Sequence, residues 1–175
     1  MRLAGRHYHD GKPVWLEIDD GRIADAGTFR TSAPDALPWI APGLVDLQVN
    51  GFAGGEFTDA SLTIEGVQRI SLGLDGEGVT TYLPTVVTHS MTRHTRVLRT
   101  IAEAIETCPD VCRRVPGVHL EGPYISAEEG PRGAHPLEYC RPPDWDEFQW
   151  LQDAARGTIR ILTMSPEFPG AADFI

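Results

Sequence analysis

From residue 41 onward, the chain alternates between short apolar segments and longer segments with helical periodicity. Four segments have the length and the β-branched composition of strands: 43–49, 79–87, 115–120 and 158–164. Apolar residues at helical spacing occupy the intervals between them. Parallel strands need crossover connections, usually helices. Four strand–helix units in succession therefore predict a parallel sheet with helices packed against it.

Helix-end signals support these assignments. Ser90 is a suitable N-cap before one helical segment, and Asp144 with Glu147 has the spacing of a capping box before another. Gly78 and Gly157 stand where helices end, at positions that favour glycine. The helices are expected to start near Leu62, Ser90 and Asp144.

Two α/β architectures fit this pattern, an open doubly wound sheet and a (β/α)8 barrel of the TIM type. No G-x-G-x-x-G motif follows the first strand, which disfavours a dinucleotide-binding fold. A complete barrel needs about 250 residues. We therefore expect a partial barrel, comprising about the first four β-α units, in a chain of 175 residues.

The first 41 residues have a different character. Residues 14–18 and 22–27 alternate between apolar and polar types on either side of Asp20-Gly21, a strong signal for a β-hairpin. Residues 31–38, with two prolines, are predicted to be a linker. We expect a small N-terminal β domain over residues 1–41 and the truncated barrel over residues 42–175.

Two pairs of polar residues lie at strand ends. Because residues two apart on a strand face the same side, Gln48 and Asn50 should project together, as should His119 and Glu121. The carboxyl ends of strands are where α/β barrels keep their active sites. An imidazole and a carboxylate there suit a divalent metal. The alternatives are an ordinary Asn-Gly turn and a buried His–Glu hydrogen bond.

Together these motifs resemble the N-acetylglucosamine-6-phosphate deacetylase family of the amidohydrolase superfamily, over its N-terminal half only. Many amidohydrolases carry His-x-His on the first strand, whereas the Gln-x-Asn form resembles members with a single metal. The matching segments are PGLVDLQVNG (42–51) followed by GG (54–55), GVTTYLPT (78–85), HLEGPY (119–124), GAH (133–135) and SPE (165–167).

The resemblance implies an activity and roles for individual residues. The family removes the acetyl group from N-acetylglucosamine 6-phosphate, giving glucosamine 6-phosphate and acetate. Glu121 takes the place of its glutamate metal ligand, and Ala134 and His135 the place of substrate-binding residues. Gln48, Asn50 and His119 would line the active site. The resemblance also implies one divalent ion, zinc or iron, and makes the first 41 residues part of a small β-sandwich.

The family's remaining site residues are expected beyond Ile175. They are two histidine ligands on later strands and the catalytic aspartate, so no catalytic acid or base can be assigned in this sequence. Three hypotheses follow: an incomplete deacetylase, another amidohydrolase acting on a different N-acyl or cyclic amide, or a non-catalytic half-barrel that needs a partner chain. The Gln-x-Asn pair disfavours the His-x-His branches of the superfamily.

Charge and composition disfavour two classes of partner. The formal net charge is −10 and the fifteen basic residues are scattered, which disfavours nucleic acid and anionic membranes. A local pocket can still bind a phosphorylated amino sugar. Neither a membrane-spanning apolar run nor a secretory signal is present, so the cytoplasm is the expected location. We expect the complete enzyme to be a homo-oligomer. Cys108, Cys112 and Cys140 lack the spacing of a zinc site and are expected to be ordinary thiols.

Overall fold

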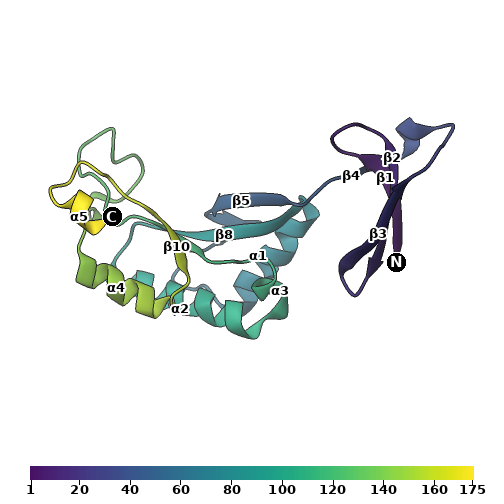
Figure 1. Cartoon of the computed structure of the whole chain (residues 1–175). Coiled ribbons are helices and arrows are strands. Elements are labelled where there is room, and N and C mark those ends of the chain that lie inside the picture. Colours follow the sequence, from purple (N-terminus) through teal and green to yellow (C-terminus); the bar gives the residue numbers. More distant parts are fainter. The chain divides into compact units, whose positions relative to one another are not determined.

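The computed structural model describes residues 1–175, which divide into two compact units, Met1–Gly43 and Leu44–Ile175. The first unit is a four-stranded sheet in the order β3-β2-β1-β4 (Figure 1). Its strands are β1 (Arg2–His7), β2 (Pro13–Asp19), β3 (Arg22–Thr28) and β4 (Trp39–Ile40).

The predicted hairpin is confirmed as β2 and β3. The strands are antiparallel and Asp19 pairs with Arg22, which leaves a two-residue loop. Both loop residues have positive φ, 46° at Asp20 and 70° at Gly21, as a type I′ turn requires. The predicted linker contains one short 3-10 turn, Pro34–Ala36. Strands β1 and β4 were not predicted.

The second unit is an α/β unit with a parallel sheet. The sheet has the order β10-β9-β8-β5, and each strand pairs in parallel with its neighbour. In Figure 1 the helices α1, α2 and α4 lie along one face of this sheet. The strands are β5 (Leu44–Val49), β8 (Val79–Val87), β9 (Val118–Glu121) and β10 (Ile159–Thr163); the helices are α1 (Ile64–Gly76), α2 (Met91–Thr107), α3 (Pro109–Cys112), α4 (Trp145–Ala154) and α5 (Ala171–Phe174).

The predicted strand–helix alternation is thus confirmed, with small changes at the ends. Helix α1 begins at Ile64 rather than near Leu62, because the Thr63 side chain caps it by accepting from the Gly66 N–H. Strand β9 begins at Val118 rather than Val115, whose N–H is still bonded to the Val111 carbonyl of α3. A two-stranded hairpin of β6 (Gly51–Phe52) and β7 (Gly55–Glu56) follows β5.

The predicted helix caps are also confirmed. Ser90 Oγ accepts from the Arg93 N–H at 3.4 Å, and Asp144 Oδ1 accepts from the Glu147 N–H at 2.9 Å. Gly157 has a φ of 76°, a left-handed conformation that glycine adopts without strain. The core lies between the sheet and the helices, and includes Val118 and Leu120 of β9.

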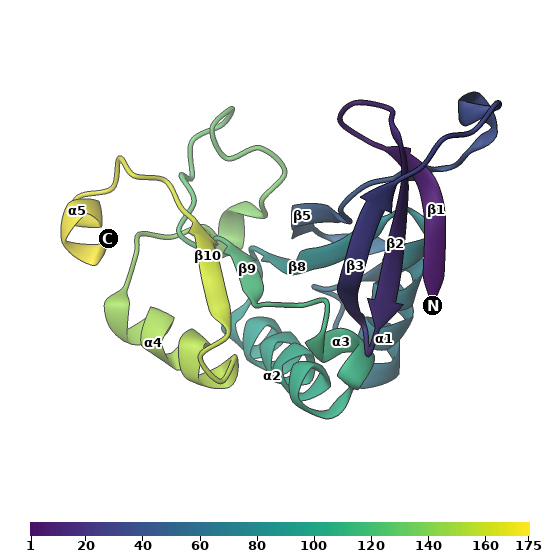
Figure 2. The same cartoon turned by 45° about the vertical axis from the view of Figure 1, so that its right-hand side comes forward.

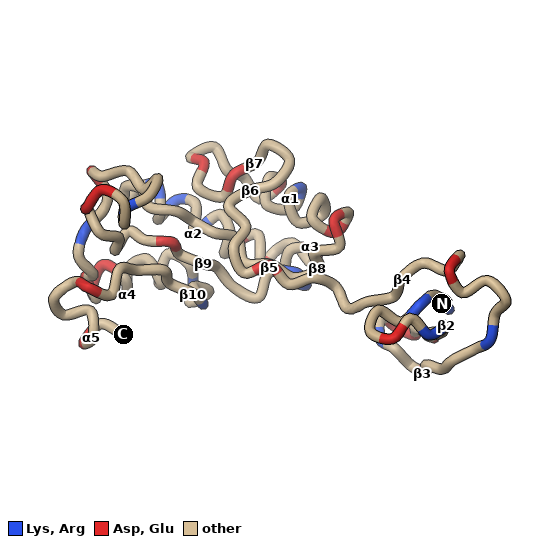
Figure 3. The backbone as a smooth tube through the Cα atoms, turned by 90° about the horizontal axis from the view of Figure 1, so that it is seen from above, with Lys and Arg blue, Asp and Glu red and all other residues tan.

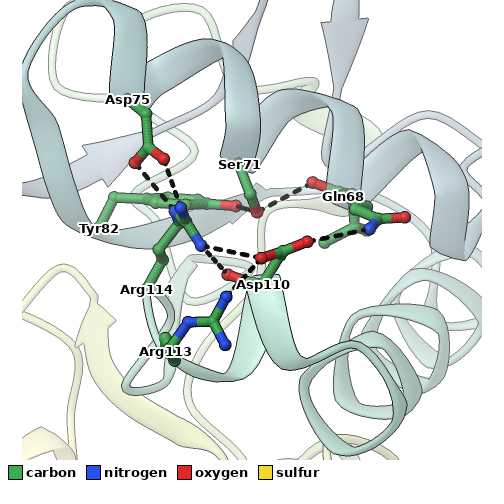
Figure 4. A network of polar contacts seen from close by, with 8 residues as sticks. Gln68, Ser71, Asp75, Tyr82, Asp110, Arg113 and Arg114 are labelled. Atoms are coloured by element: carbon green, nitrogen blue, oxygen red, sulfur yellow. Dashed lines mark hydrogen bonds and ion pairs between the residues drawn. The ribbon is translucent and has the colours of Figure 1, made fainter. Parts of the chain in front are cut away.

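A polar network fastens α1 to the segment that leads into β9 (Figure 4). The Arg114 guanidinium donates to both carboxylate oxygens of Asp75 at the end of α1, and also to the Asp110 carbonyl. Beneath it, the buried Tyr82 hydroxyl of β8 lies 2.8 Å from Ser71 Oγ of α1. This network lies on the amino-terminal side of the strands, so it fixes the helix–sheet packing away from the strand ends that carry the predicted site.

Two surface properties bear on partners. Lys and Arg residues are distributed over several elements and do not form one stripe (Figure 3). None of the helices has both the length and the apolar character needed to cross a bilayer.

Candidate active site

The carboxyl ends of the sheet strands bring several polar side chains together. In a parallel sheet these ends share one edge, and the loops that follow β9 and β10 rise from that edge in Figure 2. The cluster comprises Gln48 of β5, Thr88 just after β8, Glu121 at the end of β9, and His135 in the loop after β9.

Glu121 is at the centre of this cluster. It is the last residue of β9, a strand paired in parallel with β8 and β10, so its predicted position is confirmed. Its Oε2 accepts from Gln48 Nε2 at 3.0 Å, and its Oε1 lies 3.7 Å from His135 Nε2. The side chain is only 18% exposed. A carboxylate this sheltered needs polar neighbours or a cation.

Thr88 connects the other two groups. Its hydroxyl donates to the Glu121 carbonyl at 3.2 Å and lies 2.8 Å from His135 Nδ1. Gly122, with a φ of 83°, makes room for it: a Cβ at that residue would lie 2.0 Å from Thr88 Oγ1. Thr88 was not among the residues predicted from the sequence; its position directly after a predicted strand indicates a strand-end residue but not its neighbours.

His119 faces the same side of β9 as Glu121 but is engaged elsewhere. Its Nδ1 lies 3.1 Å from the Leu47 carbonyl and its Nε2 lies 2.7 Å from Thr163 Oγ1. Because a carbonyl only accepts, Nδ1 carries the hydrogen and Nε2 accepts from the Thr163 hydroxyl. His119 is buried, with 4% of its surface exposed. It therefore ties the ends of β5 and β10 to β9.

The remaining predicted residues lie around this cluster. The Asn50 carbonyl accepts from the Phe57 N–H at 2.9 Å, and Asn50 lines a cleft of about 490 Å³ with the β6–β7 hairpin. Ala134 is exposed beside His135 in the loop after β9. The motif residue Ser165 accepts from the Ser126 N–H at 2.7 Å, which joins the loops after β9 and β10.

The loop after β8, residues 88–90, is held from both sides. On one side His94 of α2 is fully buried, and its Nε2 lies 2.9 Å from the Val87 carbonyl and 3.0 Å from the His89 N–H nitrogen. On the other side the His89 ring stacks on Tyr139, with ring centroids 4.6 Å apart. Thr88 therefore lies in a rigid segment.

Burial of His94 makes stability depend on pH. Desolvation lowers the pKa of His94 from 6.5 to about 4, helped by the positive charge of Arg141. Below pH 6.5 the unfolded chain binds a proton that the folded chain excludes, so the folded state should lose up to about 3 kcal/mol as the pH falls from 6.5 to 4. Urea unfolding at a series of pH values measures this loss.

Two variants isolate the His94 contribution. His94→Gln should flatten the fall in unfolding free energy between pH 6.5 and 4, whereas His9→Gln, at an exposed position of the first unit, should leave it in place. An equally steep fall in His94→Gln would contradict this assignment.

The cluster supplies only some of the ligands that a metal ion needs. Glu121 and His135 are the two potential ligands within reach of each other, and no group of three or more His, Cys, Asp or Glu side chains is placed to hold an ion. The three cysteines are free thiols and do not contribute. The cluster supplies a sheltered carboxylate, an amide donor and an imidazole, which is an incomplete metal site.

Known proteins resemble the chain in both sequence and fold. No protein-family model matches the chain. The N-acetylglucosamine-6-phosphate deacetylase of Bacillus subtilis (strain 168) is 32% identical over 165 residues, which cover 89% of this chain and 41% of the relative. The N-acetylgalactosamine-6-phosphate deacetylase of Escherichia coli O157:H7 is 30% identical over 167 residues, which cover 91% of this chain and 41% of the relative.

The solved structures that resemble the chain are of the same kind of enzyme as these relatives. The crystal structure of N-acetyl-D-glucosamine-6-phosphate deacetylase from Mycobacterium smegmatis superposes with a TM-score of 0.80 at 30% sequence identity, covering 99% of this chain and 46% of that one. A mutant of that protein, in complex with N-acetyl-D-glucosamine-6-phosphate, also matches with a TM-score of 0.80, at 29% identity. The chain spans less than half the length of each of these proteins.

Proposed function

We propose that the chain belongs to the N-acetylglucosamine-6-phosphate deacetylase family and provides part of an enzyme that hydrolyses N-acetylglucosamine 6-phosphate, because its sequence and fold resemble those enzymes. The products are glucosamine 6-phosphate and acetate. The observation that carries the proposal is the position of Glu121, sheltered at the carboxyl end of a parallel strand with Gln48 and His135 beside it. That is the strand end where α/β barrels place their chemistry.

We propose that the second unit is the first part of a (β/α)8 barrel. Its strands are ordered in the sheet as they are along the chain, and α1, α2 and α4 lie on one face of the sheet (Figure 1). A doubly wound sheet would instead reverse its strand order and place helices on both faces. The proposed domains remain residues 1–41, as part of a β-sandwich, and residues 42–175, as the truncated barrel.

We propose Glu121 as one ligand of a single divalent ion, zinc or iron. The donor set fits only in part, since the described residues hold no group of three ligands, so further ligands would come from outside residues 1–175. Bound there, such an ion would activate water and polarise the amide carbonyl. Gln48 orients the carboxylate by donating to Oε2, and His119 holds the β5, β9 and β10 ends in place.

On the substrate side, we assign binding to Ala134 and His135 and lining of the site to Gln48, Asn50 and His119. Ala134 is exposed and His135 is 17% exposed on the loop over the strand ends, so both are accessible to a small ligand. A second candidate substrate is N-acetylgalactosamine 6-phosphate, which the name of the Escherichia coli relative favours.

A chimaera tests this function. Residues 1–175 would replace the matching part of the Bacillus subtilis relative, and acetate release would be measured with both sugar phosphates and with unphosphorylated N-acetylglucosamine. We expect metal-dependent release from a sugar phosphate and much weaker release from the unphosphorylated sugar. A folded, metal-loaded chimaera that releases no acetate from either sugar phosphate, while the parent enzyme does, would refute the proposal.

A further inference from the structure

We propose that Thr88 is a positioning residue that selects the tautomer of His135. In this arrangement Nδ1 of His135 carries the ring hydrogen and the Nε2 lone pair faces the Glu121 carboxylate. The meaning of this arrangement for catalysis rests on the proposed function. The arrangement itself is inferred from which atoms of Thr88, Glu121 and His135 can donate a hydrogen bond and which can only accept one.

The Thr88 hydroxyl has one hydrogen to give. The Glu121 carbonyl, 3.2 Å away, can only accept, and we assign the hydroxyl hydrogen to that contact. The contact of 2.8 Å between Thr88 Oγ1 and His135 Nδ1 must then be made by a hydrogen on Nδ1. In a neutral imidazole only one nitrogen carries hydrogen, so Nε2 is left as an acceptor.

The distance between His135 Nε2 and the Glu121 carboxylate agrees with hydrogen on Nδ1. His135 Nε2 lies 3.7 Å from Glu121 Oε1, too far for a hydrogen bond between them. A hydrogen on Nε2 would favour closing that gap, since charge-assisted N–H···O bonds are short and strong. With a lone pair there instead, the carboxylate stays available, and the gap can be bridged only by a cation or by a hydrogen-bond donor of a ligand.

Thr88 is held firmly enough to impose this choice. Its hydroxyl packs against Gly122, where any Cβ would collide with it. The segment around it is fixed by buried His94 beneath and by the stack of His89 on Tyr139 above. Tyr139 belongs to the same loop as His135, so both the hydrogen bond and the stack fasten that loop to the end of β8.

Nitrogen NMR of the histidine rings tests the inference on the 175-residue chain itself. Long-range proton–nitrogen correlations, recorded at alkaline pH in solution or on sedimented protein, distinguish a protonated from a bare ring nitrogen. The His135→Gln spectrum assigns the signals. In the unmodified chain we expect hydrogen on Nδ1 of His135, which is the minor tautomer of free neutral imidazole side chains.

Two variants complete the test. Thr88→Ser keeps the hydroxyl and should keep the Nδ1 hydrogen, whereas Thr88→Val has nearly the same shape without a hydroxyl and should move the hydrogen to Nε2. The same tautomer in Thr88→Val as in the unmodified chain would overturn the inference. Hydrogen on Nε2 in the unmodified chain would overturn it even if Thr88→Val failed to fold. Since no substrate is involved, these results are independent of whether the deacetylase proposal holds.

Discussion

Glu121→Ala is expected to abolish metal retention and deacetylation in the chimaera that carries residues 1–175. The variant removes the one carboxylate that the strand end presents and leaves Gln48 Nε2 without its 3.0 Å acceptor. Changes to residues that merely support metal ligands cost ten- to a hundredfold in affinity or activity, so loss of a ligand should cost more than about a hundredfold. Metal content by elemental analysis and acetate release are the measurements.

Glu103→Ala is the matched control, because Glu103 is an exposed carboxylate on α2, outside the cluster. It should retain metal and turnover. Glu121→Gln keeps the shape of the side chain but removes its charge, so its metal content should be as low as that of Glu121→Ala. Its urea midpoint of unfolding should be closer to that of the unmodified protein. Normal metal stoichiometry with near-normal turnover in Glu121→Ala would exclude Glu121 as a ligand.

The 175-residue chain alone is expected to self-associate and to release no acetate with added zinc or iron. The sheet ends in β5 on one side and β10 on the other, and exposed strand edges recruit other chains. On β5, Leu44, Val45 and Leu47 are 61%, 63% and 57% exposed. Without further ligands, one carboxylate and one imidazole form a weak site for a divalent ion. Sedimentation velocity and an acetate assay measure the two effects.

A pair of leucine variants tests the cause of association. Leu47→Lys places a charge on the β5 edge and should shift the chain towards monomer. Leu72→Lys changes a leucine that is 47% exposed on α1 and should shift it less. A stable monomer that hydrolyses the sugar phosphate in a metal-dependent way would contradict both the association and the need for further ligands.

Local signals predicted the second unit well. The stretch from Val79 to Val87 is rich in β-branched and apolar residues, and β8 has those same bounds. Ser90 and Asp144 are caps because their side chains accept from N–H groups three residues ahead, a contact that depends on local sequence alone. Element type follows from such short-range chemistry.

The unpredicted elements depend on partners distant in sequence. Strand β1 contains glycine and arginine without clear alternation, and β4 has two residues, so each exists because of its pairing with the other and with β2. In the site, the period-2 rule stops applying at Val49, where β5 ends and the chain turns into the β6–β7 hairpin. The role of Thr88 required knowing that the ends of β8 and β9 are neighbours, which only the sheet order reveals.

The hydrogen bond between Gln48 and Glu121 spans 73 residues and crosses the intervening strand β8. Neither partner can find the other until two complete strand–helix units lie between them, and closing so long a loop is slow compared with forming any single helix. As a ribosome delivers the chain from its amino end, α1 and β8 can fold early. The Glu121 carboxylate would acquire its hydrogen bond from Gln48 only after β9 has emerged and paired with β8. The polar cluster therefore forms after the helix and strand that support it.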